Sequence, residues 1–414
     1  MFLNRKALTK IQAVVIAIII IVAVVGAVGY YLLTPKAPAK EYIVLGASIC
    51  LSGPLGHLGE TEKAGYEFAI EDINAQGGIY VKEYGRRIPV KLVVYDDESD
   101  PTKAKANAEK LLTVDRVDFL LTSWGTPMVL AAATVAEAHK VPIVGPGSAS
   151  TVYEKKGFKY AFIVFHTEYK AIPNYFEMFE KVLPADKRPY KVAIWQEDTI
   201  LGKDYATAVA ESVKKFPGYK VVLHEVYTPR STDYSTMILK TKEANPDIIF
   251  SVPTTTDAIV LLRQSKDLGF SPKLFNLNRA CEPYEFWESL GEDAQATVAH
   301  MTGHPLLPIP KNLELTERYK KKFGTMPSTG LPAAYAAVQV LAAAIEKAGS
   351  LDKEKVREAL SNISVDTVIG KVTFKGPGHA EVPIVIMQWQ NGKQEIIWPE
   401  EFATAKLMYP KPAW

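Results

Sequence analysis

A strand, a loop and a helix are predicted between residues 42 and 79. Residues 42–49 are apolar or β-branched, and Ser52–Gly56 interrupts this run with turn-forming residues. From Glu60 onward, apolar residues recur at helical spacing, at Tyr66, Ala69, Ile70 and Ile73. Because the first N–H groups of a helix have no partners within it, the preceding loop can receive a small polar or anionic group. Every α/β protein has such junctions, so this stretch alone leaves binding open.

The same alternation continues along the chain. Further strands are predicted at 88–95, 119–122, 142–144, 160–165, 191–196, 220–226, 247–252 and 273–277. Helices are predicted at 101–113, 128–139, 173–183, 203–216, 234–243 and 257–268. Helical patterns dominate 312–360, and short strands return at 371–374, 382–389 and 395–398. These βα units contain more strands than one compact sheet usually holds. We therefore predict an α/β fold with two doubly wound, Rossmann-like lobes.

Four segments carry a family resemblance. They are Ser52–Gly56 with the helix after it, Tyr95–Pro101, Pro142–Ser150 and Val365–Gly370. Their sequences, SGPLG, YDDESDP, PIVGPGSAS and VDTVIG, resemble motifs of the leucine/isoleucine/valine-binding protein family, the type I periplasmic solute-binding proteins of ABC importers. The resemblance covers roughly residues 41–398 in family order and implies a type I periplasmic-binding-protein fold without a cofactor.

The resemblance also implies that each lobe is discontinuous. Lobe 1 is expected at residues 41–164 with 300–384, and lobe 2 at 165–299 with 385–414. The crossings between the lobes would form a hinge. Sequence periodicity alone does not reveal where the chain crosses from one lobe to the other.

The N-terminal part has the pattern of a membrane anchor. Residues 11–33 are apolar except for Gln12 and are long enough to cross a hydrocarbon core of ~30 Å, so a transmembrane helix is predicted. Three cations, Arg5, Lys6 and Lys10, are concentrated before this span, so the tail 1–10 is expected in the cytoplasm. The Pro/Ala/Lys linker 34–40 would then hold the main domain outside the cell, tethered to the cell membrane.

The start of the chain allows a second interpretation. Lys6–Gln12 resembles the pilin-type signal segments of archaeal solute-binding proteins, which are cut just before the apolar stretch. Cleavage after Ala7 is therefore a hypothesis. In either case the apolar stretch stays attached to the domain.

Composition excludes several classes of protein. With 414 residues, 48% hydrophobic and 23% charged, the chain is typical of a globular protein. A formal net charge of +2 gives no basic field, so nucleic acid is not an expected partner. Cys50 and Cys281 lie far apart without metal-ligand spacing, so free buried thiols are preferred, and one disulfide remains an alternative outside the cell.

The loops after the third and fourth strands are candidate ligand-binding segments. Ligands of open α/β sheets bind outside the carboxyl ends of the strands. By resemblance, these loops hold the carboxylate of an amino acid through hydroxyl and backbone N–H groups, and they correspond here to Trp124, Gly125, Thr126, Gly147, Ser148 and Ala149. Gly125 and Ala149 replace a family serine and threonine. Thr126, Ser148 and Ser150 are the hydroxyl groups that can take over.

The second lobe departs further from the family. Arg279 stands about where an ammonium-binding glutamate is expected, and a cation there would repel an α-ammonium group. Glu282 is close enough in sequence to compensate; without compensation, a carboxylate, amide or other small polar metabolite is the expected ligand. Further candidate contacts are Leu58, His166, Tyr169, Thr254 and Thr255.

Catalytic and metal-binding motifs are not found. The sequence has no Gly-x-Ser-x-Gly, Walker A, dinucleotide-binding or HExxH motif. His300 and His304 are four residues apart, but Gly303 and Pro305 disfavour a helix, so core or surface histidines are preferred to a metal site. The acidic run 96–98 is interpreted as a solvated turn. We expect no catalytic residue and no metal.

The sequence therefore predicts an extracellular solute-binding protein and not an enzyme. It would close on a small ligand, such as a branched-chain or related amino acid, an amide or a carboxylate, and deliver it to the permease subunits of an ABC transporter. The alternative is a ligand-sensing ectodomain that signals to a membrane partner; the short predicted tail argues against an output domain there. A hydrolase of small amides would need a nucleophile and a base that the sequence does not provide.

Overall fold

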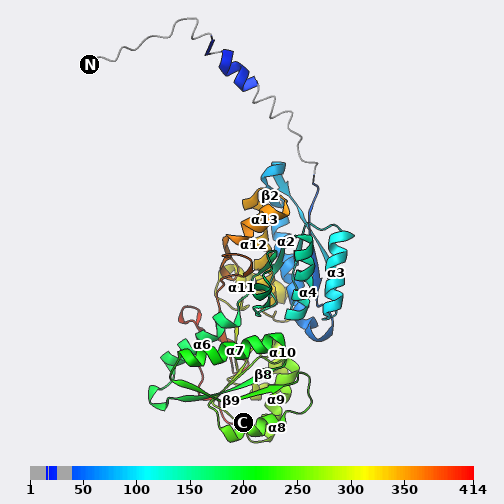
Figure 1. Cartoon of the computed structure of the whole chain (residues 1–414). Coiled ribbons are helices and arrows are strands. Elements are labelled where there is room, and N and C mark those ends of the chain that lie inside the picture. The colour runs from blue at the N-terminus through cyan, green and yellow to red at the C-terminus, as the bar shows by residue number, and fades with distance from the viewer. Residues whose placement is uncertain (1–14, 17, 26–39) are drawn as a thin grey trace, which may run out of the picture. The chain divides into compact units, whose positions relative to one another are not determined.

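The computed structural model describes residues 15–16, 18–25 and 40–414 (Figure 1). It divides the chain into two compact units, Met1–Lys40 and Glu41–Trp414, of which the second carries both lobes. Residues 15–16 and 18–25 are helical, and most of the expected anchor, tail and linker, including the cleavage site after Ala7, lies outside the described residues. Within the described residues, no helix has both the length and the hydropathy needed to span a membrane.

A parallel six-stranded sheet forms the centre of lobe 1. Its order is β15-β7-β6-β5-β1-β4, and every neighbouring pair is parallel. Its strands are β1 (Ile43–Ile49), β4 (Val90–Asp96), β5 (Phe119–Leu121), β6 (Ile143–Gly145), β7 (Ala161–Ile163) and β15 (Gly378–His379). Two small hairpins accompany it, β2 (Ile79–Val81) with β3 (Arg86–Ile88) and β13 (Ser364–Thr367) with β14 (Gly370–Thr373). The strand order reverses next to β1, where parallel sheets of this kind leave a crevice.

Helices cover both faces of this sheet (Figure 1). One apolar core lies under α2 (Gly56–Ala75), α11 (Pro310–Phe323), α12 (Gly330–Ala348) and α13 (Lys353–Ser361). The other lies under α3 (Pro101–Thr113), α4 (Thr126–His139) and α5 (Val152–Lys156). Strand residues of alternate orientation enter these two cores, Leu45 and Phe119 the first and Leu120 and Ile143 the second.

Lobe 2 repeats the plan with a seven-stranded sheet. Its order is β17-β16-β12-β11-β10-β8-β9, parallel except at β16 and β17. Its strands are β8 (Tyr190–Glu197), β9 (Tyr219–Tyr227), β10 (Ile248–Ser251), β11 (Leu274–Leu277), β12 (Val298–Met301), β16 (Val385–Gln390) and β17 (Lys393–Trp398). One core lies under α6 (Glu168–Val182) and α7 (Ile200–Lys215), and the other under α8 (Ser235–Ala244), α9 (Thr255–Asp267) and α10 (Tyr284–Leu290). The two-lobed α/β fold predicted from the sequence is confirmed.

The chain passes between the two sheets three times. It leaves lobe 1 after β7, leaves lobe 2 after β12 and returns to lobe 2 between β15 and β16. Each lobe is therefore built from segments that are distant in sequence. The first crossing, residues 164–167, runs directly into α6 and contributes to the candidate site described below.

A local signal explains the start of α3 but not that of α6. Asp100 caps α3, because its carboxylate accepts hydrogen bonds from the N–H groups of Thr102 and Lys103 at 2.6 and 3.1 Å. The predicted start of a helix at Pro173 is wrong, since α6 begins at Glu168 and Pro173 lies inside it. Burial of the face that carries Ala171, Ile172, Tyr175 and Phe176 outweighs the lost backbone hydrogen bond.

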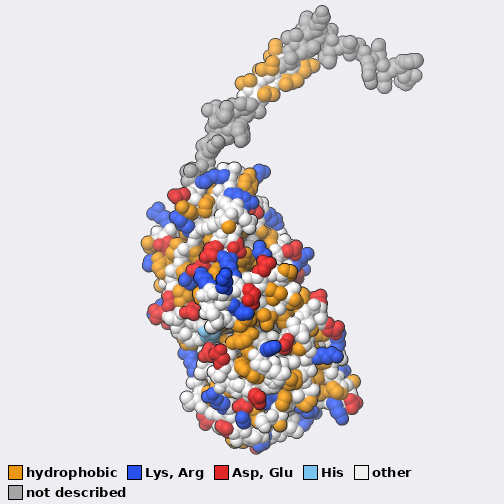
Figure 2. Space-filling view, turned by 180° about the vertical axis from the view of Figure 1, so that it is seen from behind, with side chains coloured by type: hydrophobic (Ala, Val, Ile, Leu, Met, Phe, Trp, Pro, Cys, Tyr) orange, Lys and Arg blue, Asp and Glu red, His pale blue; other side chains and the backbone are white. Residues whose placement is uncertain are grey.

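The cysteines and the charged surface match the expectations from composition. Cys50 and Cys281 are both free and buried, and burial raises the pKa of the Cys50 thiol to about 12, which makes it unreactive. Figure 2 shows Lys and Arg side chains interspersed with Asp and Glu over the visible face of residues 41–414. Neither sign dominates that face, in line with the small net charge.

Candidate functional site

A cavity of about 470 Å³ lies between the lobes at the carboxyl ends of their strands. Lobe 1 contributes the loops after β1, β4, β5 and β6, and lobe 2 contributes those after β8, β9, β10 and β11. The segment after β7, which crosses between the lobes, also lines the cavity. We call the segments Trp124–Thr126 and Gly147–Ala149 the lobe 1 wall, and the residues Glu197, Asn278, Arg279 and Glu282 the lobe 2 wall. The volume suits a ligand of the size of an amino acid or a small aromatic acid.

The lobe 1 wall depends on two glycines. Gly125 and Gly147 have φ values of +87° and +105°, and the Gly125 N–H donates to the Gly147 carbonyl at 2.8 Å. A Cβ atom on Gly147 would lie 1.9 Å from the Ser123 carbonyl oxygen, and one on Gly125 would lie 2.5 Å from the Met128 side chain. Glycine replaces the expected serine at 125 because the backbone there has a positive φ that residues with a side chain rarely adopt.

Two of the hydroxyl groups proposed as substitutes meet in the cavity. The Thr126 and Ser148 Oγ atoms are 3.1 Å apart, both side chains are buried, and both line the cavity. Ser150, the third, is engaged elsewhere, since its hydroxyl donates to Asp204 Oδ2 at 2.7 Å. Thr126 and Ser148 are therefore the lobe 1 hydroxyls available to a ligand.

Asp204 joins the lobes beside the cavity. This residue of α7 in lobe 2 also accepts from the Thr151 N–H at 2.9 Å and pairs with Lys155 Nζ at 2.8 Å, both from lobe 1. These contacts and the hydrogen bonds of Ser150 hold the pKa of Asp204 below its usual value, against the effect of burial. The carboxylate is thus a charged link between the lobes.

Apolar and aromatic side chains provide much of the remaining lining. Trp124 and Phe165 pack edge to face with ring centroids 5.4 Å apart, and Leu58 lies nearby in the same core. Trp124 is only 7% exposed, and its indole N–H has no hydrogen-bond partner among the described residues. The indole nitrogen lies beside Gly330 of α12, where a Cβ atom would stand 3.1 Å from it, so Trp124 contributes mainly its ring to the cavity.

Arg279 does not present a free charge to the cavity. Its guanidinium binds both carboxylate oxygens of Glu197 at 3.1 Å and donates to the carbonyls of Val252 and Pro253 at 2.8 and 3.1 Å. Glu197, and not Glu282, is the compensating carboxylate. The expected repulsion of an α-ammonium group is therefore largely cancelled by a pair inside lobe 2.

Glu282 lines the cavity and has no ion-pair partner in the described part of the chain. Burial raises its pKa to about 8, an increase that Glu168 reinforces and Arg279 partly offsets. The carboxyl group is therefore mostly protonated at neutral pH and can donate a hydrogen bond.

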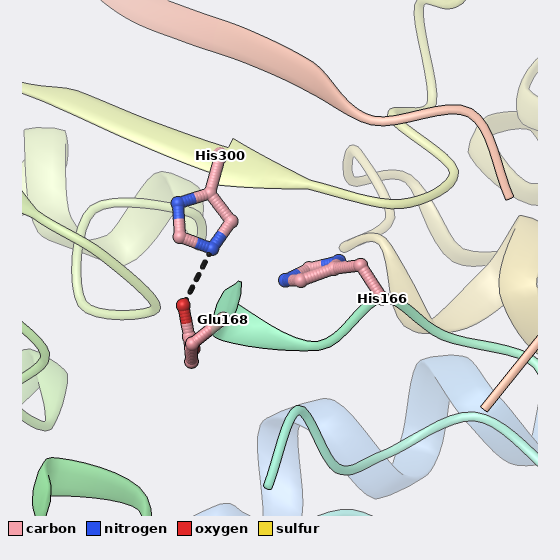
Figure 3. Close-up of side chains that lie close together, drawn as sticks. All are labelled: His166, Glu168 and His300. Carbon is pink, nitrogen blue, oxygen red and sulfur yellow. Dashed lines mark ion pairs between the residues drawn. The ribbon is translucent and has the colours of Figure 1, made fainter. Parts of the chain in front are cut away.

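The first crossing brings buried polar groups to the floor of the cavity (Figure 3). His166 and Glu168 line it, and His300 of β12 lies behind them with Nε2 3.0 Å from Glu168 Oε2. His166 Nδ1 lies 2.9 Å from the Thr302 hydroxyl oxygen, and burial together with the nearby His300 and His379 holds the pKa of His166 well below its usual value. His166 is therefore neutral.

The cavity gathers all the predicted ligand residues except two. Tyr169 lies outside the lining, with its ring centroid 6.0 Å from Lys155 Nζ, and the Thr255 hydroxyl donates to the Ala280 carbonyl at 3.1 Å. Thr254 lines the cavity and also caps α9 by accepting from the Asp257 N–H. His304, considered with His300 as a metal pair, is a buried loop residue bonded to Gln394 at 3.1 Å.

Sequence reasoning missed six polar lining residues. They are Ser99, Glu168, Glu197, Thr199, Arg230 and Asn278. Glu197 ends β8 and Asn278 directly follows β11, so the rule that ligands bind at carboxyl ends of strands would have identified both. For Glu168, the signal was its position beside the predicted contact His166.

Two parallel-sheet lobes, three crossings and a cavity between facing strand ends define a two-lobed solute-binding protein. Residues 43–394 match the periplasmic binding protein family, and the chain belongs to that family. Its fold is the α/β type I periplasmic binding protein fold.

Relatives with a similar sequence span nearly the whole chain. Leu/Ile/Val-binding protein homolog 7 of Brucella abortus (strain 2308) is 27% identical over 407 residues, covering 91% of this chain and 96% of the relative. Homolog 8 of Brucella suis is 25% identical over 396 residues, with coverage of 91% and 96%. These relatives are solute-binding proteins and not enzymes, which confirms the expectation that the chain is not an enzyme.

Solved structures share the fold at low sequence identity. The branched-chain amino acid transporter substrate binding protein LivJ from Streptococcus pneumoniae, in complex with isoleucine, is 22% identical with a TM-score of 0.73, covering 89% of this chain and 100% of that chain. A Rhodopseudomonas palustris ABC transporter solute binding protein in complex with benzoate is 16% identical with a TM-score of 0.71, covering 90% and 97%. The same fold therefore accommodates an aliphatic amino acid in one protein and an aromatic acid in another.

Proposed function

We propose that the chain binds a small carboxylate with an apolar body, such as a branched-chain amino acid or an aromatic acid, and delivers it to the permease of an ABC importer. The observation that carries the proposal is the composition of the cavity. Hydroxyl groups of Thr126 and Ser148 stand in one wall beside an apolar lining that includes the ring of Trp124. These are donors for a carboxylate and a surface for its hydrocarbon part.

The lobe 2 wall is compatible with ligands that have or lack an amino group. Arg279 is neutralised by Glu197, and the protonated Glu282 can lose its proton when an ammonium group approaches. A branched-chain amino acid would therefore bind with release of a proton near neutral pH, whereas an amine-free acid would bind without this release. Leu/Ile/Val-binding protein homologues among the relatives favour the first class.

The location of the protein is part of the proposal. The apolar residues 11–33, preceded by Arg5, Lys6 and Lys10, support a single N-terminal anchor with residues 41–414 outside the cell. A domain held at the membrane in this way is placed to meet a permease. The resemblance of Lys6–Gln12 to archaeal signal segments supports cleavage after Ala7.

Binding is tested by calorimetry and thermal shift on the purified full chain with leucine, isoleucine, benzoate and acetamide. A ligand at 100 times its Kd stabilises the folded state by about 2.7 kcal/mol, so Tm rises measurably. Repeating the calorimetry in buffers of different ionisation enthalpy counts released protons. Uptake of the bound solute through a permease is then measured in membrane vesicles.

Ser148→Ala is expected to weaken binding by about tenfold, since it removes one buried hydroxyl from the carboxylate. Ser289→Ala, a change at an exposed position of α10, is the matched control and should leave Kd unchanged. Equal effects of both variants would contradict the assignment of the lobe 1 wall. Binding without uptake would favour the sensing ectodomain, and binding of none of the four compounds would overturn the proposal.

A further inference from the structure

Three metal-ligating side chains meet at the floor of the cavity. One nitrogen each of His166 and His300 and one carboxylate oxygen of Glu168 all lie within 4.8 Å of one another (Figure 3). All three residues are buried, with exposures of 2%, 0% and 1%. They come from two segments: the first crossing with the start of α6, and strand β12.

These groups lack the hydrogen bonds expected of buried polar atoms. His166 Nε2 and Glu168 Oε2 have no hydrogen-bond partner among the described residues. Unpaired buried polar groups are costly, so such a cluster calls for a species that satisfies several of them at once. No hydrogen bond among the described residues holds an N–H group of His166 or His300 in a direction toward the other two side chains.

Asn278 determines which kind of atom His300 presents. The His300 backbone N–H donates to Asn278 Oδ1 at 3.0 Å, so the Asn278 amide nitrogen is the atom 3.1 Å from His300 Nε2. An amide nitrogen only donates, so Nε2 faces it with a lone pair. Glu168 Oε2 then lies 3.0 Å from a second electron-rich atom, a contact that needs a positive species nearby.

We propose that His166, Glu168 and His300 form a binding site for one divalent transition-metal ion of the zinc type. Two neutral imidazoles and one carboxylate are a ligand set that Zn²⁺ uses, with bonds of roughly 2.0–2.2 Å and further positions left for water or substrate. Binding would draw the three ligand atoms together, and the lone pair of His300 would pass from Asn278 to the ion. The Thr302 hydroxyl, 2.9 Å from His166 Nδ1, would fix the orientation of that ring.

The site has an entry path and an open side. His166 and Glu168 line the cavity, so an ion can reach them from it, whereas His300 lies behind and closes the site. His166 and Glu168 line the same cavity as the Thr126 and Ser148 hydroxyls that are proposed to bind the solute carboxylate. Metal binding can be tested without any solute. The metal proposal can therefore fail while the proposed function holds, and the proposed function can fail while the metal proposal holds.

The test is calorimetry of the purified full chain with Zn²⁺ after chelator treatment, in the absence of any solute. We expect one Zn²⁺ per chain, and with Co²⁺ a visible absorption band typical of low-symmetry nitrogen and oxygen coordination. His166→Gln, Glu168→Gln and His300→Gln should each weaken Zn²⁺ binding more than the roughly 10- to 100-fold loss typical of outer partners.

His139→Gln is the matched control, since His139 also pairs with a glutamate, Glu109 at 2.8 Å, but at an exposed position. It should retain the affinity and the Co²⁺ spectrum. Circular dichroism of the metal-free variants shows which of them fold, and any one folded variant of the cluster suffices for the comparison. The proposal would be overturned if the unmodified chain did not bind Zn²⁺, or if all three cluster variants still bound it. A proton on Glu168, and not a metal ion, would then be the positive species between His300 Nε2 and Glu168 Oε2.

Discussion

The two walls of the cavity differ in what determines their structure: backbone conformation in lobe 1 and cancelled charges in lobe 2. The lobe 1 wall consists of uncharged residues and depends on backbone conformation, with Gly125 and Gly147 at positive φ and a hydrogen bond between them. The lobe 2 wall combines the uncharged Asn278 with three ionisable residues, whose charges are cancelled by pairing in Arg279 and Glu197 and by protonation in Glu282.

The contrast shows how a cavity can be polar and nearly neutral. Lobe 1 provides hydrogen-bond donors that carry no charge, so its wall can bind many kinds of carboxylate. In lobe 2, Arg279 and Glu197 already satisfy each other's charge, so a ligand must compete with an internal partner to use either of them. We therefore expect changes in the lobe 2 wall to cost stability first, and changes in the lobe 1 wall to alter ligand affinity or loop geometry.

The largest expected effect comes from breaking the charge pair of lobe 2. Glu197→Gln leaves Arg279, a mostly buried cation, without its bidentate partner. Loss of one member of a buried pair costs about 3–5 kcal/mol of unfolding free energy, and the partial exposure of Arg279 places the expected value near the lower bound. Urea denaturation measures the change.

A double variant sharpens this prediction. Glu197→Gln combined with Arg279→Met removes both charges and should recover most of the lost stability. Glu225→Gln, which breaks the exposed pair with Lys240, should cost less than about 1 kcal/mol. A double variant as unstable as the single one would show that the pair does not act as a unit.

The next effect concerns the backbone of lobe 1. Gly147→Ala places a Cβ atom 1.9 Å from the Ser123 carbonyl oxygen at φ +105°, so we expect a loss of about 3 kcal/mol in unfolding free energy, with weaker ligand binding. Gly157→Ala at φ +68°, where nothing lies within 4 Å, should cost only about 1 kcal/mol. If both variants lost a similar amount of unfolding free energy, the positive φ alone, and not the contact with Ser123, would determine the loss.

The smallest effect is a change in pH dependence. The folded-state pKa of Glu282, about 8, exceeds its ordinary value of 4.5, so between these values the folded state binds more protons than the unfolded state. Stability from Glu282 is complete below the ordinary pKa and is lost as pH rises through about 8, at up to roughly 1.4 kcal/mol per pH unit.

Glu282→Gln removes this titration and should flatten the stability curve between the ordinary pKa of 4.5 and the folded-state pKa of about 8, measured by urea denaturation at about one-unit steps in pH. Glu288→Gln, at an exposed position of α10, should follow the unmodified chain. Parallel curves for all three proteins would show that Glu282 is ionised in the folded state and that the lobe 2 wall carries a negative charge.

Local order was predictable from sequence because its causes are local. The Asp100 cap and Pro101 mark the start of α3, and the apolar run before Ser52 marks β1. The exception, Pro173 inside α6, arises because packing of the helix against lobe 2 outweighs the usual meaning of proline.

The site was predictable in position but not in its charge state. The rule for strand ends located Trp124, Ser148 and Arg279 in the cavity. The partner of Arg279 lies 82 residues earlier in the chain, and no periodicity links the two. The meeting of His166 with His300 likewise requires the crossings between the lobes, which one sequence does not display.

The placement of α12 has a consequence for how the chain acquires its structure during synthesis. This helix is buried along most of its length and fills the core beneath α2 and β6, yet it begins only at Gly330. Until then α2 covers only part of one apolar face of the sheet that starts at Ile43, while β8 to β12 are synthesised as a continuous stretch. Lobe 1 is the first part to leave the ribosome and the last to be completed, so a chain that stops before α12 would expose an aggregation-prone surface.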